Sequence, residues 1–534
     1  MANLLMIMEM MVMKKEFKAL ADGRKLDNNA DIIEKILEVR GIEDVDVFLH
    51  PTSDALIPLS MLKNIEDAYK IVEYAIDNKF NIQIRADTDC DGVCAGSIMY
   101  RYLSHFTSHI TVDINEGKEH GVKSLETSAD VLIVVDSINE ADEYRKFTDN
   151  GTTVLVLDHH IPPSPIEDYS HITLVSSAVD YPNPELSGAG VVWKFCKYLD
   201  DMFLTDYADE YIDLAGTAII ADMMDMNVPE NRYIVYEALT NLHNVGLKAI
   251  VGSYAFDSQS VSFSVSPLIN ACNRMNRNQL ALNIFLTDNE TKAKQIVKEM
   301  KAVKEQQNEL VAELMPSLIE AAEVWNNRKI ISVVIDTEYG IAGLLANKLL
   351  DKYQRPVLVL KFTDDGYAGS MRACGVDNFA LMVNETGLAE CEGHENAAGI
   401  KILGENYESF IESIDKKLSS VEFEEHVTAD IQIDIEQINT QLIENIKAIN
   451  FVSGTGFKAV SVMIEGVSGY ETSSMSQGKH LKLVTDNCLI IKWNDCPTEQ
   501  VYDKTVDVIA NVNYGRFGRV SYNQVIVNEL RVKE

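Results

Sequence analysis

The sequence predicts a multidomain α/β protein whose first domain is built around a parallel sheet. Three short apolar runs, 82–84, 131–135 and 154–157, are separated by stretches in which apolar residues have helical spacing. This alternation is typical of parallel sheets. Each run is followed by acidic or histidine side chains. A chain of 534 residues is also too long for a single hydrophobic core.

The composition indicates a cytoplasmic globular protein without disulfide bonds. Hydrophobic residues make up 46% of the chain and charged residues 24%, as in ordinary soluble proteins. The eight cysteines include no C-x-x-C pair, which argues against a zinc site and for free thiols in a reducing compartment. No stretch has the length of a membrane span. The methionine-rich segment 1–13 lacks the features of a signal peptide, and we interpret it as translation from an upstream start codon.

The net charge of −35 bears on whether the chain can bind nucleic acid. A basic domain is the usual sign of nucleic-acid binding. Binding depends on the local field in a groove, however, and divalent metals reverse the local sign of an acidic site. The acidity therefore weakens the expectation of nonspecific DNA binding without excluding a nuclease.

The first half of the chain is predicted to form a helical lead-in and an α/β domain. Residues 28–80 have apolar residues at helical spacing, and we expect 1–80 to pack on the first α/β domain, 81–285. A helix over 93–103 is expected after the first strand. A charged helix over 286–328 is predicted as a connector, and Pro316 is expected to kink or end it.

The second half is predicted to contain another α/β domain and a β-domain. Residues 329–420 show strands at 330–335 and 357–360 on either side of a helix at 340–350. Residues 428–534 contain short alternating strands, a pattern that suits a small β-barrel. These strands are expected at 461–464, 480–484, 489–493, 505–513 and 524–528.

The run Asp87-Thr88-Asp89-Cys90-Asp91-Gly92 matches the start of an EF-hand calcium loop but not its end. That loop needs a glutamate at its twelfth position, where this chain has Ile98. A helix should also precede the loop, whereas here an apolar strand does. A solvated acidic turn is the remaining alternative to a metal site. We favour the metal site because three carboxylates beside a buried strand repel each other unless a cation neutralises them.

Three further polar positions follow apolar segments. Asp136 follows 131–135, Asp158-His159-His160 follow 154–157, and Asp222 follows an apolar stretch of its own. Taken singly, they could be a turn or helix-cap acid, a surface histidine pair and a helix-terminal acid. Together with the first cluster they supply a mixture of carboxylates and imidazoles that suits Mn²⁺ or Mg²⁺. Two such ions about 4 Å apart would activate a water molecule and clamp the leaving oxygen in a displacement at phosphorus.

These clusters resemble the sequence motifs of the DHH phosphoesterase family, and in particular those of its RecJ-type single-stranded-DNA-specific exonucleases. The run 87–92 resembles the first motif, Val135-Asp136 the second, Asp158-His159-His160 the third and Ala221-Asp222 the fourth. The resemblance continues in one order to the end of the chain. Further similar strings are Phe48-Leu49-His50-Pro51, Leu186–Val191, Glu230-Asn231-Arg232, Ile269–Arg274, Gly340–Gly343, Arg355-Pro356, Gly369–Arg372, Gly393–Gly399 and Gly478–Lys482.

The resemblance implies a fold and a metal site. A DHH catalytic domain, a connector helix, a DHHA1-type substrate-binding domain and an OB-like nucleic-acid-binding barrel would follow one another along the chain. Two divalent ions, Mn²⁺ or Mg²⁺, would lie in the DHH domain, with Asp136 as the bridging ligand. The implied ligands are Asp87, Asp89, Asp136, His159 and Asp222.

The resemblance also implies roles in catalysis and substrate binding. His160 and Asp136 would be the catalytic residues, with His160 touching the scissile phosphate and assisting the attack. Asp91 belongs to the exonuclease version of the first motif and is a further candidate metal ligand. The implied substrate-binding residues are Arg274, Arg372, His394 and Lys479.

The implied activity is a 5′ to 3′ exonuclease that releases mononucleotides from single-stranded DNA in recombination or repair. A nano-RNase or cyclic-dinucleotide phosphodiesterase is the first alternative, since these relatives share both α/β domains but typically lack the terminal barrel. A non-catalytic DHH scaffold of a replication or repair complex is the second. Besides DNA, the expected partners are a single-strand-binding protein or a helicase, and no membrane is expected.

Basic and aromatic residues alternate in the predicted barrel, where they would supply phosphate contacts and stacking faces for a single strand. The aromatic residues could equally fill the core of the barrel. The basic residues are Lys479, Lys482, Lys492, Arg516 and Arg519, and the aromatic residues are Trp493, Tyr514, Phe517 and Tyr522.

The chain departs from the family pattern at several positions. Arg85-Ala86 replaces a glycine-containing lead-in to the first motif, and Ser137-Ile138 replaces cysteine and glycine after the second. Leu268 stands where the family often has arginine, and Asn273 and Glu392 replace glycines. None of these changes removes an expected metal ligand. They indicate a divergent member of the family, such as one encoded by a phage or mobile element, and leave its substrate preference and processivity open.

Overall fold

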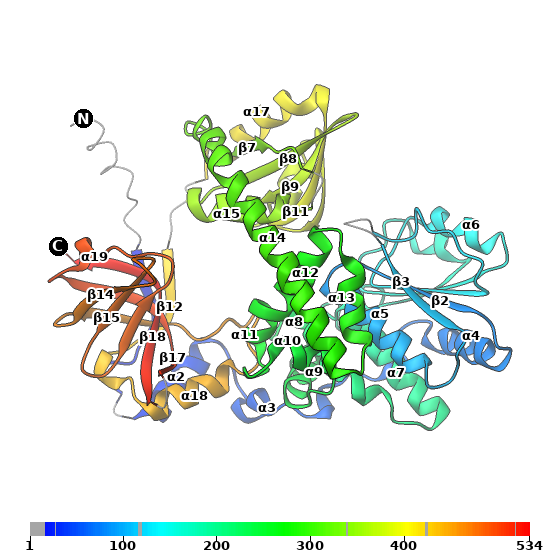
Figure 1. Cartoon of the computed structure of the whole chain (residues 1–534), viewed down its shortest axis with the longest axis horizontal. Helices are drawn as coiled ribbons and strands as arrows, with labels where there is room; N and C mark the ends of the chain where they lie inside the picture. The colour runs from blue at the N-terminus through cyan, green and yellow to red at the C-terminus, as the bar shows by residue number, and fades with distance from the viewer. Residues whose placement is uncertain are drawn as a thin grey trace. The chain divides into compact units, whose positions relative to one another are not determined.

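The computed structural model describes residues 16–26, 28–115, 120–337, 340–421, 426–517 and 520–533 (Figure 1). The methionine-rich segment 1–13 lies outside them, as do Arg519 and the side chains of Arg516 and Phe517. Within the described ranges, no helix combines the length and the apolar character that crossing a membrane requires.

The chain divides into two compact units. The larger unit contains Leu59–Asp222 and Asn241–Phe423, and the smaller contains Met1–Pro58, Met223–Thr240 and Glu424–Glu534. Residues 1–80, expected to pack on the first α/β domain as one lead-in, are instead divided between the two units, with the boundary between Pro58 and Leu59. The other predicted domain boundaries stay predictions.

A parallel sheet organises the first α/β domain of the larger unit, as the apolar runs predicted. Its five strands lie in the order β3-β2-β4-β5-β6, and every neighbouring pair is parallel. The carboxyl ends of the three central strands therefore meet at one edge of the sheet. The strands are β2 (Ile82–Ala86), β3 (Ile110–Ile114), β4 (Val131–Val135), β5 (Thr153–Asp158) and β6 (Thr173–Ser176).

Helices cover both faces of this sheet, which explains why β4 is apolar along its whole length. Figure 1 shows α6 on one face and α4 and α7 on the other. Helices α5, α7 and α8 also pack against one another, and nearly all of α8 is buried. The helices of this region are α4 (Ile65–Asp77), α5 (Cys90–Leu103), α6 (Arg145–Thr148), α7 (Gly188–Phe203), α8 (Ile212–Ala221), α10 (Val245–Val251), α11 (Ser258–Ser260), α12 (Ser266–Arg274) and α13 (Asn278–Leu286).

The connector is a single helix, α14 (Glu290–Glu323), and Pro316 lies inside it. The expectation that Pro316 could end the helix is wrong, because α14 continues beyond it to Glu323. A proline inside a helix costs about 3 kcal/mol, and burial of apolar side chains on both sides of it offsets this cost. Val311, Leu318 and Ala322 all belong to the core of the second α/β domain.

The second α/β domain is a mixed sheet in the order β10-β11-β9-β8-β7, with only β7 and β8 parallel. Alternate residues of β8 enter two different cores: Val357 and Val359 pack with α15, and Leu358 and Leu360 pack with α16 and α17. The elements are β7 (Ile331–Val334), α15 (Ala342–Tyr353), β8 (Val357–Thr363), β9 (Gly366–Arg372), α16 (Phe379–Asn384), β10 (Ala389–His394), β11 (Ala397–Leu403) and α17 (Tyr407–Leu418).

The predicted C-terminal β-domain forms an eight-stranded mixed sheet in the smaller unit, in which four of the seven neighbouring pairs are antiparallel. Its order is β1-β12-β13-β17-β18-β16-β15-β14. The strands are β1 (Glu16–Asp22), β12 (His426–Gln432), β13 (Val462–Val467), β14 (Glu471–Met475), β15 (His480–Val484), β16 (Leu489–Lys492), β17 (Thr505–Phe517) and β18 (Val520–Lys533).

The N-terminal segment completes this sheet, which the sequence pattern did not indicate. Strand β1 pairs in parallel with β12, so that Phe17 lies beside Val427. Helix α2 also packs against α18 and β12. The helices of the smaller unit are α2 (Asn29–Val39), α3 (Val45–Leu49), α9 (Pro229–Thr240), α18 (Thr440–Asn450) and α19 (Thr498–Val501).

A bidentate ion pair connects Arg40, at the end of α2, to Asp430 of β12. The Arg40 guanidinium donates through Nε and Nη2 to the two oxygens of Asp430, both at 2.8 Å. Each side chain is only 11% exposed. Nη1 of Arg40 also donates to the Lys458 carbonyl at 2.7 Å. Removing one partner of such a pair leaves an uncompensated charge in the protein interior.

We therefore expect Arg40→Ala to lower the free energy of unfolding of the smaller unit by about 3 kcal/mol. Urea unfolding and hydrogen exchange of β12 would measure the loss. Arg24→Ala is the control, because Arg24 pairs with Asp22 at the exposed surface and its loss should change little. Equal effects of the two substitutions would contradict the role given to Arg40.

Candidate metal centre

Carboxylates and imidazoles gather at the carboxyl edge of the parallel sheet. They form three overlapping groups whose ligand atoms lie within 4.8 Å of one another in each group. Asp136 and His159 each belong to two of the groups. The groups are Asp87-Asp89-Asp136, Asp136-Asp158-His159-His160 and Asp91-His159-Asp222.

The first group is positioned by the ends of β2 and β4. Asp87 follows β2 directly, and Asp89 caps α5 by accepting a hydrogen bond from the Gly92 N–H at 3.0 Å. Asp136 follows β4 and has a φ of +57°, in the left-handed region that aspartate tolerates better than most residues. Its N–H donates to the Leu157 carbonyl at 2.9 Å, which fixes this strained backbone beside β5.

His159 stands at the centre of the acidic residues. Its Nε2 atom lies 3.4 Å from Oδ1 of Asp136, 3.5 Å from Oδ2 of Asp222 and 3.8 Å from Oδ2 of Asp91. Burial and the charge of His160 lower the pKa of His159 to about 4. The imidazole is therefore neutral at pH 7, which is the form that binds a metal ion.

His160 has the opposite electrostatic environment. Its Nδ1 atom lies 3.0 Å from Oδ1 of Asp158, which is completely buried. The negative charge of Asp158 raises the pKa of His160 to about 10, against the effect of burial. Burial also acts to raise the pKa of Asp158, but His160 outweighs it and the net shift is downward. His160 is thus a cation, and its side chain is 56% exposed.

The remaining carboxylates are costly to keep charged. Burial is the largest effect that raises the pKa values of Asp87, Asp91, Asp136 and Asp222, and neighbouring carboxylates add to it. Oδ1 of Asp136 and Oδ2 of Asp222 are also buried without a hydrogen-bond partner among the described residues. Divalent cations would supply both the missing charge and the missing partners of these oxygens. The donor set therefore fits hard divalent ions.

Asp91 has a further structural task that the sequence did not reveal. Its two oxygens accept hydrogen bonds from the N–H groups of Gly188 and Ala189, each at 2.8 Å. These N–H groups begin α7, where the helix dipole favours a negative charge. Asp91 thereby fixes α7 against the metal centre, in addition to its proximity to His159.

Comparisons with known proteins agree with this arrangement. Residues 81–224 match the model of the DHH family N-terminal domain, and residues 326–420 match the DHHA1 domain. These two matches identify a DHH-type domain and a DHHA1-type domain within the chain. The parallel-sheet domain is its DHH domain, and the mixed-sheet domain that follows α14 is its DHHA1 domain.

Relatives of this chain include RecJ proteins and a prophage protein. The SPbeta prophage-derived protein YorK of Bacillus subtilis (strain 168), named as a single-strand DNA-specific exonuclease, is 27% identical over 470 residues, which cover 80% of this chain and 81% of YorK. The single-stranded-DNA-specific exonuclease RecJ of the same organism is 24% identical over 547 residues, or 94% of this chain and 68% of RecJ.

The fold also matches a solved RecJ structure. RecJ from Thermus thermophilus, in complex with Mn²⁺, superposes with a TM-score of 0.80 at 22% identity. The match covers 98% of this chain and 80% of that RecJ chain. It supports the complete predicted order of DHH domain, connector helix, DHHA1 domain and C-terminal β-domain.

The predicted substrate-binding residues divide between the two units. Arg274 ends α12 in the DHH domain, and Arg372 and His394 end strands of the DHHA1 domain. The charge of Arg372 adds to burial in lowering the pKa of Arg274, and His394 contributes, after burial and His160, to the lowered pKa of His159. Lys479 is exposed between β14 and β15 of the smaller unit.

Two contacts of the DHH domain escaped the sequence analysis. Nδ1 of His120 lies 2.8 Å from Oδ1 of Asp87, and Asn273 donates to the Thr88 hydroxyl at 3.1 Å. His120 stands in no motif, so only its position in space reveals it. Asn273 replaces a family glycine, and its amide supports the first motif. Arg85, another departure from the pattern, pairs with Asp113 of β3.

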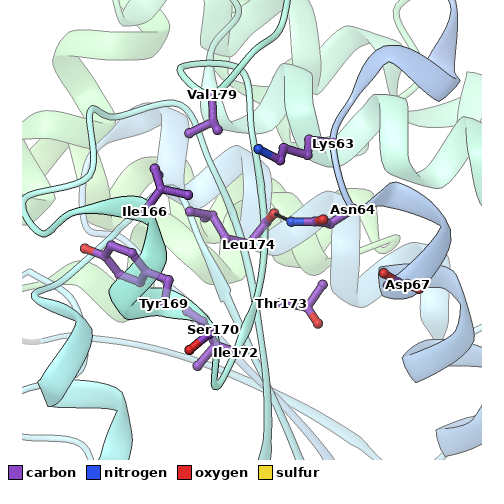
Figure 2. A pocket seen from close by; sticks show the side chains of 10 residues that line it. All are labelled: Lys63, Asn64, Asp67, Ile166, Tyr169, Ser170, Ile172, Thr173, Leu174 and Val179. Carbon is purple, nitrogen blue, oxygen red and sulfur yellow. Dashed lines mark hydrogen bonds between the residues drawn. The ribbon is translucent and has the colours of Figure 1, made fainter.

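A hollow at the other end of the parallel sheet is not lined by a comparable group of metal-binding side chains. Figure 2 shows its lining, in which the Asn64 amide donates to the Leu174 carbonyl. Thr173, at the amino end of β6, also lines it, so it lies at the opposite end of this strand from the metal centre. The residues that line it include no cluster of carboxylates and histidines.

We expect Gly188→Ala to disrupt the metal centre while leaving the fold intact. A β-carbon at Gly188 would come within 2.3 Å of Oδ1 of Asp136, so Asp136 would have to move. Mn²⁺ affinity, measured by calorimetry, should fall by more than about 10-fold. Gly404→Ala is the control, because a β-carbon there meets nothing closer than 3.6 Å. Equal affinity in both variants would contradict the close packing of Gly188 on Asp136.

The crowded carboxylates predict an unusual dependence of stability on pH. The pKa of Asp91 is raised from 3.8 to about 7. The folded state therefore binds a proton more tightly than the unfolded state, and the stability this gives is lost as the pH rises through about 7. We expect Asp136→Asn, which removes one repelling carboxylate, to raise the melting temperature of the EDTA-treated protein more at about pH 8 than at about pH 5.

Mn²⁺ should reverse the difference in melting temperature between Asp136→Asn and the wild type. It should stabilise the wild type most at the higher pH, where protons do not compete for the ligands, and should stabilise Asp136→Asn less. Differential scanning fluorimetry with and without Mn²⁺ would measure both effects. A wild type that is more stable than Asp136→Asn in EDTA at both pH values would disprove the predicted repulsion.

Proposed function

We propose that this chain is a metal-dependent exonuclease that removes mononucleotides from single-stranded DNA in the 5′ to 3′ direction. The observation that carries the proposal is the sharing of Asp136 and His159 between adjacent ligand groups. Such sharing suits two ions side by side better than one. The single-stranded DNA substrate is taken from the relatives, which are named as single-strand-specific exonucleases, and the direction from the family resemblance.

Asp136 would bridge two divalent ions, Mn²⁺ or Mg²⁺. Asp87 and Asp89 share one ligand group with Asp136, and His159 belongs both to a group with Asp136 and to a group with Asp222. Asp91 is a further candidate that also holds α7. When bound, two such ions lower the pKa of a water molecule and neutralise charge on a phosphate. The buried, unpartnered oxygens of Asp136 and Asp222 support this assignment.

His160 would act on the substrate directly. Asp158 holds its Nδ1 atom and keeps the imidazole charged, so the exposed part of the ring presents a cation. A cation there can donate a hydrogen bond to a non-bridging phosphate oxygen and stabilise the charge that develops during attack. His159, which is neutral and buried, is unsuited to this role.

Arg274, Arg372 and His394 would bind the phosphates of the strand beside the metal centre. Arg372 donates to the Met371 carbonyl at 2.7 Å and lies 3.3 Å from the Ser370 hydroxyl, which holds its guanidinium in place for a phosphate. Lys479 would contact the strand in the C-terminal domain. We further propose a cytoplasmic role in DNA recombination or repair, with a single-strand-binding protein or helicase as partner.

The test is digestion of single-stranded DNA labelled at either end, in Mn²⁺ or Mg²⁺. The wild type should release the 5′ label at once and convert 3′-labelled strands to progressively shorter products. Asp136→Asn should lose more than about 100-fold of the rate, since even outer-shell partners of a metal often contribute that much. Arg24→Ala, which removes an exposed arginine paired with Asp22 and outside the ligand groups, should digest DNA normally.

The same assay separates the alternatives. Duplex DNA and short RNA are run alongside the single strand. Cleavage of only di- or trinucleotides would favour a nano-RNase, and no cleavage of any substrate would favour a scaffold. Asp136→Asn with the full rate of the wild type would refute the metal assignment.

A further inference from the structure

A cavity of about 390 Å³ lies between three helices of the larger unit, apart from the ligand groups of the metal centre. Each helix contributes residues from one face, as their spacing requires. Helix α14 provides Lys304, Gln307 and Val311, α12 provides Arg274 at its end, and α15 provides Leu344 and Lys348.

The charge of this cavity is one-sided. Arg274, Lys304 and Lys348 line it, and no aspartate or glutamate does. Among the described residues, none of the three cations takes part in a salt bridge. The net charge of the chain is −35, so a cavity lined by three cations without a salt bridge is unexpected.

Two of the cations, Lys304 and Arg274, are also held where a positive charge costs free energy. Burial and the charge of Arg274 lower the pKa of Lys304, and burial and the charge of Arg372 lower that of Arg274. Bringing like charges together in a partly buried place costs free energy. An anion in the cavity would reverse this cost.

Gln307 gives a second, independent indication of a ligand. Its side chain lines the cavity, is only 4% exposed, and its Oε1 atom has no hydrogen-bond partner in the described part of the chain. Buried amides without partners are rare in folded proteins, because the lost hydrogen bonds to water are not replaced. A ligand with a hydrogen-bond donor would satisfy this oxygen.

We propose that this cavity binds a nucleotide, with its phosphate on Lys304, Lys348 and Arg274 and its base near Gln307. The apolar side chains of Val311 and Leu344 would contact the sugar or the base, and the Gln307 amide would pair with a polar edge of the base. A metal cation is excluded by the charge of the lining. The ligand could be the next nucleotide of the bound strand or a free mononucleotide; the strand source rests on the proposed function.

The experiment measures binding by the full chain in EDTA, so that no DNA is cut. Fluorescence anisotropy follows a labelled oligothymidylate, and calorimetry follows thymidine 5′-monophosphate. The double variant Lys304→Ala/Lys348→Ala should bind one or both at least about 10-fold more weakly. If the oligonucleotide is the ligand, the slope of log affinity against log salt should also fall by about 1.4, or roughly 0.7 for each lost contact.

The control is Lys298→Ala/Lys301→Ala, which removes the same charge from exposed positions of α14 that do not line the cavity. Weaker binding of the oligonucleotide alone identifies the strand as the ligand, and weaker binding of the mononucleotide identifies the free nucleotide. If the double variant binds both ligands as the control does, the proposal is overturned.

Gln307→Leu keeps the proposal testable if the double variant does not fold. It removes a buried amide without a partner, so the melting temperature should not fall, whereas nucleotide binding should weaken. Unchanged binding of both ligands would overturn the role of the cavity. In Mn²⁺, a wild type that binds DNA without cutting it would overturn the proposed nuclease function but not the binding site.

Discussion

Repulsion among buried carboxylates around Asp136 is the constraint on which the rest of the larger unit depends. The parallel sheet forces the ends of β2, β4 and β5 together, and each end brings acidic groups. Backbone N–H groups of α7 relieve part of this repulsion at Asp91, and Gly188 leaves room for Asp136. Divalent cations would neutralise the carboxylate charge that remains. The stability of this fold and the proposed metal binding are therefore linked.

The two adjacent histidines have identical side chains, but their different surroundings give them different protonation states. His159 is buried beside the charged His160, and its pKa falls to about 4. His160 is half-exposed and held by Asp158, and its pKa rises to about 10. A neutral imidazole and a cationic imidazole therefore stand side by side, which suits the proposed roles of His159 as a metal ligand and of His160 as a donor to the phosphate.

The negative net charge of the whole chain does not describe the charge of the residues proposed to bind a DNA strand. Arg372 lies close enough to Arg274 to depress the pKa of Arg274, and Lys304 joins them from the connector helix. These cations influence one another's pKa values although the net charge of the chain is −35, because the local field depends on nearby groups and not on the sum over the whole chain. Helix α14, which carries Lys304, continues through Pro316 with apolar residues buried on both sides of the proline.

The sequence by itself determined the strands of the DHH domain and the acidic residues at their ends. Continuous apolar runs closed by polar residues are a local signal, and parallel pairing then brings those residues to one edge. Only the tertiary structure decided the pairing of β1 with β12, about 400 residues apart, and the contacts of His120 with Asp87 and of Asp91 with α7. Such contacts depend on how distant segments pack, and no local pattern of residues encodes them.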